Sequence, residues 1–88
     1  MVAEVKGISC PQNKWTVLAA GKANVTAMVR GSGDGKIVLG NAEPTGEPGQ
    51  DYLTLNQIRS VGLTFVDNTT NVYVWPVSVE LVVEVVRE

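Results

Sequence analysis

The side chains that could carry out chemistry in this chain are few. Its 88 residues include no histidine and one cysteine, Cys10. Histidine is the usual general base and metal ligand, and a cysteine nucleophile needs an imidazole partner. A cysteine–histidine nucleophile is therefore excluded, and we expect Cys10 to be a packing residue or a spectator. Because one cysteine cannot form an internal disulfide, assembly in a reducing compartment is expected, with a covalent link between two chains as the alternative.

A glycine-rich loop at residues 31–36 invites comparison with phosphate-binding loops. A P-loop requires glycine at position 30 and serine or threonine at position 37, where this chain has Arg30 and Ile37. A dinucleotide fingerprint requires its third glycine at the position of Lys36. Because Asp34-Gly35 is a typical turn dipeptide, the loop is predicted to close a hairpin between two strands.

The carboxylates are numerous enough to supply a catalytic pair of the glycosidase kind, since Asp and Glu together number 9. Most of them lie in predicted turns and loops or at the charged C-terminal end, where solvation explains them. Calcium binding through Asp34, or through Glu43, Glu47 and Asp51, lacks any loop signature. We therefore expect no enzymatic activity, no metal site and no cofactor.

The charge and hydropathy patterns narrow the classes of partner. The net charge is −2 and the 7 Lys and Arg residues are scattered, so the basic stripe of a nucleic-acid binder is missing. No run approaches the roughly 20 apolar residues of a membrane helix, and no signal peptide pattern is visible at the N-terminus. We expect neither a nucleic-acid nor a membrane partner, and synthesis and assembly in a cytoplasm.

The elements that would position these side chains are predicted to be strands, because valine dominates the apolar residues and short runs alternate in hydropathy. Residues 52–60 fit either a strand followed by a turn, which we prefer, or a turn of helix, and residues 40–50 are predicted to be a loop. The other predicted strands cover residues 15–19, 24–30, 36–39, 61–66, 72–75 and 79–87. The fold class is all-β, a small antiparallel β-sandwich or barrel of about six or seven strands.

The domain division follows from where this pattern begins. Residues 14–88 are predicted to form a single β domain. Residues 1–13 are predicted to be an N-terminal arm, because Gly7 and the Cys10-Pro11 pair interrupt any regular element. The arm is either a frayed terminus or a segment that pairs with a neighbouring chain.

Three of the five aromatic residues are candidates for an interface: Trp15, Tyr73 and Trp75. Tyr73 and Trp75 share one face of a predicted strand, and Val72 and Val74 share the other. If the valines face the core, the aromatics face outward and would anchor a partner or a sugar. The alternative is a sheet covered on both faces, with the rings in the core.

The last predicted strand is apolar on both faces. Val79, Leu81, Val83 and Val85 share one face, while Val82 and Val86 lie on the other. A strand of this kind is normally covered on both sides, and a neighbouring subunit would supply the second cover. The interface is therefore predicted to include Trp15, Tyr73, Trp75, Val79, Leu81, Val82 and Val86.

The layout from Trp15 to the C-terminus resembles small β modules among the structural proteins of tailed bacteriophages. The resemblance rests on residues 15–21 (WTVLAAG), 23–26 (ANVT), 36–40 (KIVLG) with Pro44 behind, 72–76 (VYVWP) and the valine-rich end. Those modules are capsid decoration proteins, head fibres and tail knobs. The resemblance carries over no functional residue.

These observations lead to an expected function. We expect a non-enzymatic phage virion structural protein that decorates or stabilises the capsid or tail by protein–protein contacts. The alternative is a carbohydrate- or receptor-binding β module on a phage tail or a cell surface. The expected partners are the chain itself, as a homo-oligomer for which the analogy favours a trimer, and major capsid or tail proteins. The expected location is the virion, after assembly in the host cytoplasm.

Overall fold

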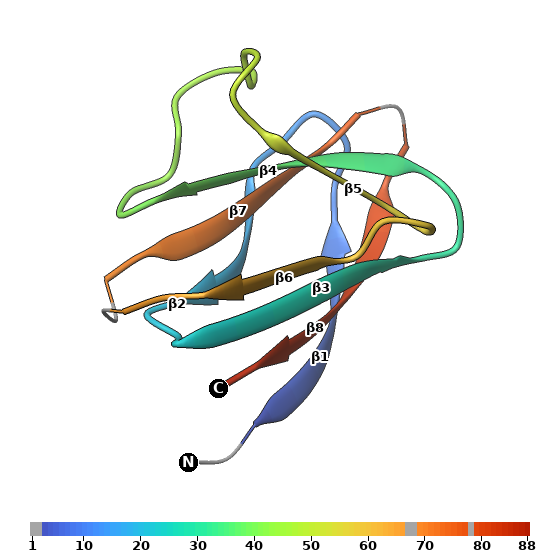
Figure 1. The fold of residues 1–88 in the computed structure, drawn as a ribbon. Coiled ribbons are helices and arrows are strands. Elements are labelled where there is room, and N and C mark those ends of the chain that lie inside the picture. The colour runs from blue at the N-terminus through green and yellow to red at the C-terminus, as the bar shows by residue number, and fades with distance from the viewer. Residues whose placement is uncertain (1–2, 67–68, 78) are drawn as a thin grey trace.

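The chain folds into two antiparallel four-stranded sheets that face each other (Figure 1). The computed structural model describes residues 3–66, 69–77 and 79–88. Sheet A has the strand order β1-β8-β3-β6 and sheet B has the order β2-β7-β4-β5. The strands are β1 (Glu4–Cys10), β2 (Thr16–Ala20), β3 (Asn24–Arg30), β4 (Asp34–Gly40), β5 (Leu53–Asn56), β6 (Val61–Thr64), β7 (Asn71–Pro76) and β8 (Leu81–Arg87). The predicted all-β antiparallel class is confirmed, as an open sandwich and not a closed barrel, but the predicted count of six or seven strands is not, because the described residues form eight.

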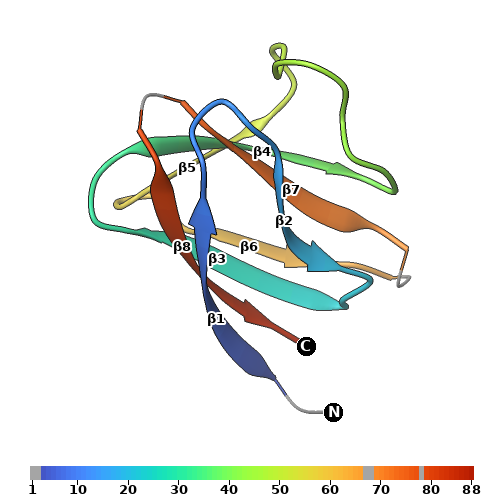
Figure 2. The same cartoon turned by 180° about the vertical axis from the view of Figure 1, so that it is seen from behind.

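The strand pairings are nested, with the first strand joined to the last. Strand β1 pairs with β8, β2 with β7, β3 with β6, and β4 with β5. Two further pairings, β3 with β8 and β4 with β7, complete the sheets. This is the order produced when a long antiparallel ribbon is rolled up, as in an eight-stranded jelly roll. The N-terminal and C-terminal strands consequently lie side by side (Figure 2).

The core lies between the sheets and is made almost entirely of small aliphatic side chains. Strand β3 shows why these residues form strands, because Val25, Ala27 and Val29 are buried while the alternate residues are exposed. The same alternation holds in β8. The buried cluster consists of Cys10, Leu18, Ala19, Val25, Ala27, Val29, Ile37, Leu55, Val61, Val72, Val74, Leu81, Val83 and Val85.

Strand β1 lies within the segment predicted to be an arm without regular structure. It pairs along its whole length with β8, from Glu4 opposite Arg87 to Cys10 opposite Leu81. Gly7 does not interrupt the strand, because its position faces outward and no core side chain is needed there. Pro11 follows the last strand residue, so its missing N–H removes no hydrogen bond from the ladder. The segment therefore pairs within its own chain through one edge of β1, and pairing of the other edge with a neighbouring chain stays a prediction.

The predicted hairpin around residues 31–35 is wrong, because β3 and β4 belong to different sheets. The loop carries the chain from sheet A to sheet B, with Gly31 and Gly33 at φ values of 90° and 122°. Asp34 and Gly35 already belong to β4. The glycine at position 33 is needed because a Cβ there would lie 2.6 Å from Leu81 Cδ2. The Asp34-Gly35 signal correctly indicated that the chain turns here, but it did not show that the next strand belongs to the other sheet.

The remaining predicted elements differ from the structure mainly at their ends. A strand followed by a turn is confirmed within residues 52–60, where Asn56 Oδ1 accepts hydrogen bonds from the backbone N–H groups of Ile58 and Arg59. Strand β6 ends at Thr64, and β8 begins at Leu81 instead of Val79.

The burial of Cys10 leads to a prediction about its thiol. Burial raises the pKa of this thiol from 9.0 to about 11. The folded chain therefore holds the proton more tightly than the unfolded chain, and this stabilisation is lost as the pH rises from 9 towards 11. We expect the free energy of unfolding of the wild type to fall over that window relative to Cys10→Ala, measured by urea unfolding. Equal pH profiles for the two proteins would contradict the prediction.

Candidate interaction surfaces

The outer surface of sheet A is the first candidate site, and we call it the sheet A face. It is formed by the outward side chains of β1, β3 and β8: Val5, Met28, Arg30, Val82, Glu84 and Val86. Val5 is 73% exposed, Met28 44% and Val86 42%. Val5 and Val86 are direct cross-strand partners, so they form a continuous apolar row. Water-exposed apolar side chains on neighbouring strands are suited to a protein contact.

One ion pair lies flat across the middle of the sheet A face. Arg30 Nε donates a hydrogen bond to Glu84 Oε2 at 2.9 Å. The guanidinium reaches over Gly7, where a Cβ would lie 3.1 Å from Arg30 Nη2. Glycine at this position therefore gives the arginine room to lie along the sheet. Since the pair contributes one charge of each sign, the face is electrically neutral although the chain carries −2.

The structure separates the predicted interface residues of the last strand. Val82 and Val86 lie on the sheet A face, where β8 runs between β1 and β3 and is therefore not an edge strand. Leu81 is only 1% exposed and belongs to the core, so it is not available to a partner. Val79 is exposed but lies before β8, and its Cγ2 is 2.9 Å from where a Cβ on Gly33 would sit.

The predicted aromatic residues gather at sheet B and are engaged within the chain. Tyr73 is only 6% exposed, and its neighbours Val72 and Val74 are also buried, so β7 is covered on both faces. Trp15 and Trp75 pack edge to face with ring centroids 5.2 Å apart. Trp15 Nε1 also donates a hydrogen bond to the Gly46 carbonyl at 2.8 Å, which ties the 41–52 loop to the sheet. Tyr73 is therefore not an outward anchor.

The link from Trp15 to the loop predicts a local effect of substitution. Trp15→Phe keeps an aromatic ring against Trp75 but removes the donor to Gly46. We expect the loop to be cut several times faster in limited proteolysis, with a loss of at most about 1 kcal/mol in the free energy of unfolding. Val17→Ala, at an exposed position of the neighbouring strand β2, is the control. Unchanged cleavage of Trp15→Phe would contradict the prediction.

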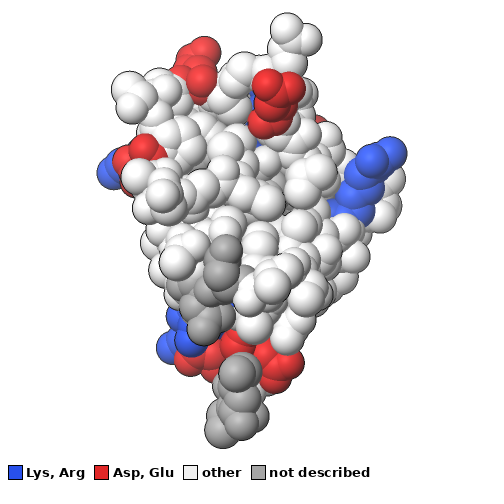
Figure 3. All heavy atoms as spheres, turned by 60° about the vertical axis from the view of Figure 1, so that its left-hand side comes forward, with Lys and Arg blue, Asp and Glu red and all other residues white. Residues whose placement is uncertain are grey.

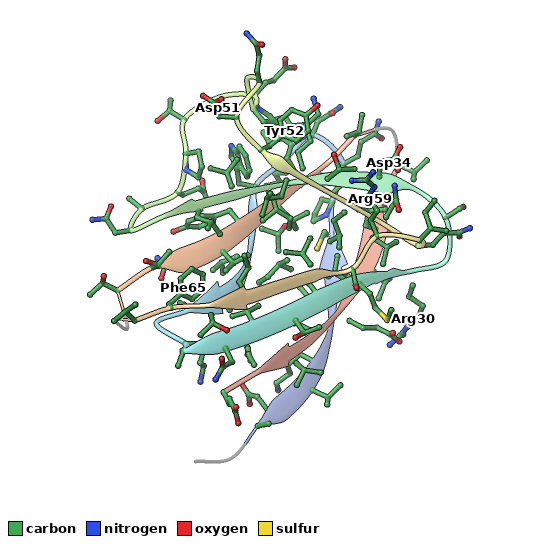
Figure 4. The ribbon with its side chains drawn as sticks, viewed as in Figure 1. Arg30, Asp34, Asp51, Tyr52, Arg59 and Phe65 are labelled. Atoms are coloured by element: carbon green, nitrogen blue, oxygen red, sulfur yellow. The ribbon has the colours of Figure 1, made fainter. Side chains whose placement is uncertain are left out.

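A polar hollow on the sheet B side was missed by the sequence reasoning. It has a volume of about 250 Å³ and is lined by Asp34, Gly35, Lys36, Tyr52, Thr54, Asn56 and Val77. Figure 4 labels Asp34 and Tyr52 on this part of the molecule. Lys36 Nζ lies 4.7 Å from the centroid of the Tyr52 ring. The alternation of Tyr52, Thr54 and Asn56 was the available signal, because residues two apart share one face of a strand.

The surface around Leu53 of β5 carries apolar side chains from β4, β5 and the β6 region. Leu39 and Leu53 are exposed there, and Leu63 and Phe65 pack against the core only in part. Two hollows of about 330 and 490 Å³ share Leu53 in their lining. Figure 3 shows that the left-hand side of Figure 1 has a broad area without charged side chains.

Among residues 3–66, 69–77 and 79–88, no three His, Cys, Asp or Glu side chains are grouped so that they could hold a metal ion. The same residues form no helix with the length and apolar character needed to cross a membrane.

In comparison with known proteins, no family model, no curated protein and no solved structure matches the chain. The function is therefore inferred from the fold and from these surfaces.

Proposed function

We propose that this chain is a non-enzymatic structural protein of a bacteriophage virion that decorates or stabilises the capsid or tail through protein–protein contacts. The observation that carries the proposal is the sheet A face, where Val5, Met28 and Val86 are exposed on adjoining strands. Burying such side chains against a partner is favourable by about 25 cal/mol per Å² of apolar surface. This surface is built for contact with another protein surface.

The fold supports the same class of function. The nested strand pairing is that of a jelly roll, an architecture used by viral capsid domains and by lectin domains. Because one fold serves many functions, the surface and the resemblance to phage accessory modules must carry the choice between them. A short chain without a disulfide also has a thin core, and association with a larger shell would stabilise it by mass action.

Co-sedimentation tests this proposal. Capsid shells or tails are assembled from the proteins that neighbouring genes encode, and the purified chain is added. We expect the wild type to sediment with one of these assemblies and Val5→Lys, which places a charge in the apolar row, to sediment at least tenfold less. Lys6→Ala, at an exposed position of the same strand, is the control. A chain that stays in the supernatant with every assembly would overturn the proposal.

A second candidate function, carbohydrate binding, is favoured by the hollow beside Tyr52. Tyr52 is 37% exposed and lines the hollow together with the hydrogen-bonding side chains of Asp34, Lys36, Thr54 and Asn56. An aromatic ring beside several polar groups is a suitable platform for a sugar. A glycan array separates the two candidates: binding that is lost in Tyr52→Ala, together with no co-sedimentation, would favour the carbohydrate function.

A further inference from the structure

We propose that a second copy of this chain packs on the sheet A face, with the two faces stacked around a two-fold axis. This inference rests on the proposed assembly function, and for the sheet A face it names a second copy on the same particle as the protein that makes the contact. A two-fold contact uses the same patch on both copies, so the patch must be complementary to itself. The sheet A face meets that condition in its shape, its charge and its apolar residues.

The position of β8 determines how the contact is made. The valine-rich strand lies between β1 and β3 and its backbone is already paired on both sides. A partner therefore cannot add a strand to β8 and must meet its outward side chains face to face. The face is flat, because Gly7 and Ser9 on β1 are small residues and the Arg30–Glu84 ion pair lies along the sheet. Two sheets can stack closely across such a surface.

The charges favour a second copy over an unrelated acidic or basic surface. Arg30 and Glu84 form the ion pair of the face, and their side chains are 60% and 41% exposed. A two-fold axis through the pair places Arg30 against the partner subunit's Glu84, which gives a network of four alternating charges. Complementary charges of this kind fix the register of an interface. By contrast, the 41–52 loop carries Glu43, Glu47 and Asp51, so two copies of that surface would repel each other.

The size of the face sets the expected strength. The sheet A face is three strands wide, at about 4.7 Å per strand, and about six residue steps long, at about 3.3 Å per step. Its footprint is therefore about 14 by 20 Å. Such a footprint buries less than the roughly 800 Å² per partner of a standard interface. We therefore expect a weak dimer, with a dissociation constant on the order of 10–100 μM, which becomes more populated where many copies are held close together on one particle.

Two reversed charges test the contact directly. Arg30→Glu gives a face with two negative charges, and Glu84→Arg gives a face with two positive charges. Each variant alone is expected to associate at least tenfold more weakly than the wild type in sedimentation velocity at about 100 μM. An equimolar mixture of the two is expected to restore dimers. The internal ion pair is lost in both variants, so recovery on mixing can arise only from contact between the two faces.

Matched variants control for net charge and folding. Arg59→Glu and Glu47→Lys make the same changes of net charge at exposed positions outside the face and are expected to dimerise like the wild type. Circular dichroism checks that every variant is folded. A monomeric wild type, a trimer, or a mixture that stays monomeric would overturn this inference. If the chain still sediments with a shell or tail in that case, the proposed function stands and only the second copy is excluded.

Discussion

Deleting residues 1–10 is expected to unfold the chain. Strand β1 pairs with β8 along seven residues, and it contributes Cys10 to the core and half-buried Ile8 against it. Its removal would leave β8 as an edge strand and would expose the inner side chains opposite Ile8 and Cys10. Burial of one large apolar side chain contributes about 1.5–3 kcal/mol. A chain of this length has a total stability of only about 4–13 kcal/mol, so the loss of a whole strand is decisive.

The control for this deletion is removal of residues 1–3, which precede β1. Circular dichroism and urea unfolding compare the two truncated chains with the wild type. We expect the shorter deletion to keep a cooperative unfolding transition and the longer one to lack it. If the longer deletion unfolds with the same midpoint as the wild type, β1 is dispensable and the segment is an arm after all.

The second large effect is expected for Gly33→Ala. Gly33 has a φ of 122°, which side chains other than glycine rarely adopt, and strain of this kind costs about 1–3 kcal/mol. The added Cβ would also lie 2.6 Å from Leu81 Cδ2 and 2.9 Å from Val79 Cγ2. Leu81 is buried and cannot move aside freely, so overpacking adds about 1–3 kcal/mol. We expect the free energy of unfolding to fall by about 2–6 kcal/mol.

Gly31→Ala separates the two causes. Gly31 also has a positive φ, 90°, but nothing lies within 4 Å of the position that a Cβ would take. This variant is expected to show the backbone cost alone, about 1–3 kcal/mol, in the same urea titration. If both variants lose equal stability, the close approach of Gly33 to Leu81 contributes nothing.

Local patterns in the sequence predict single strands well but not their partners. The alternation in residues 24–30 places β3 correctly, because a half-buried strand must alternate to bury one face. The Asp34-Gly35 signal failed to show that β4 joins the opposite sheet, since turn chemistry acts over a few residues and sheet membership is decided by the whole ribbon. Strand β1 was not predicted, because glycine and proline usually interrupt strands and the segment contains Gly7 and Pro11. In the structure neither residue disrupts the hydrogen-bond ladder between β1 and β8.

The same limit applies to the candidate interface. Alternation correctly placed Val82 and Val86 on one side of β8 and Leu81 on the other. Alternation could not show which other elements cover the outer face of a sheet. The sequence therefore allowed Tyr73 to be either an outward anchor or a core residue, and the structure shows that it is buried. Arg30 and Glu84 are 54 residues apart in the sequence and become neighbours only through the pairing of β3 with β8.

The proposed virion role is tested most directly by mass spectrometry of phage particles purified by density gradient from a host that expresses this chain together with its neighbouring genes. We expect the chain in the particle fraction at many copies per particle, and we expect Val5→Lys to reduce that copy number while particles still form. The chain found only in the soluble fraction, with complete particles that lack it, would contradict the proposed function.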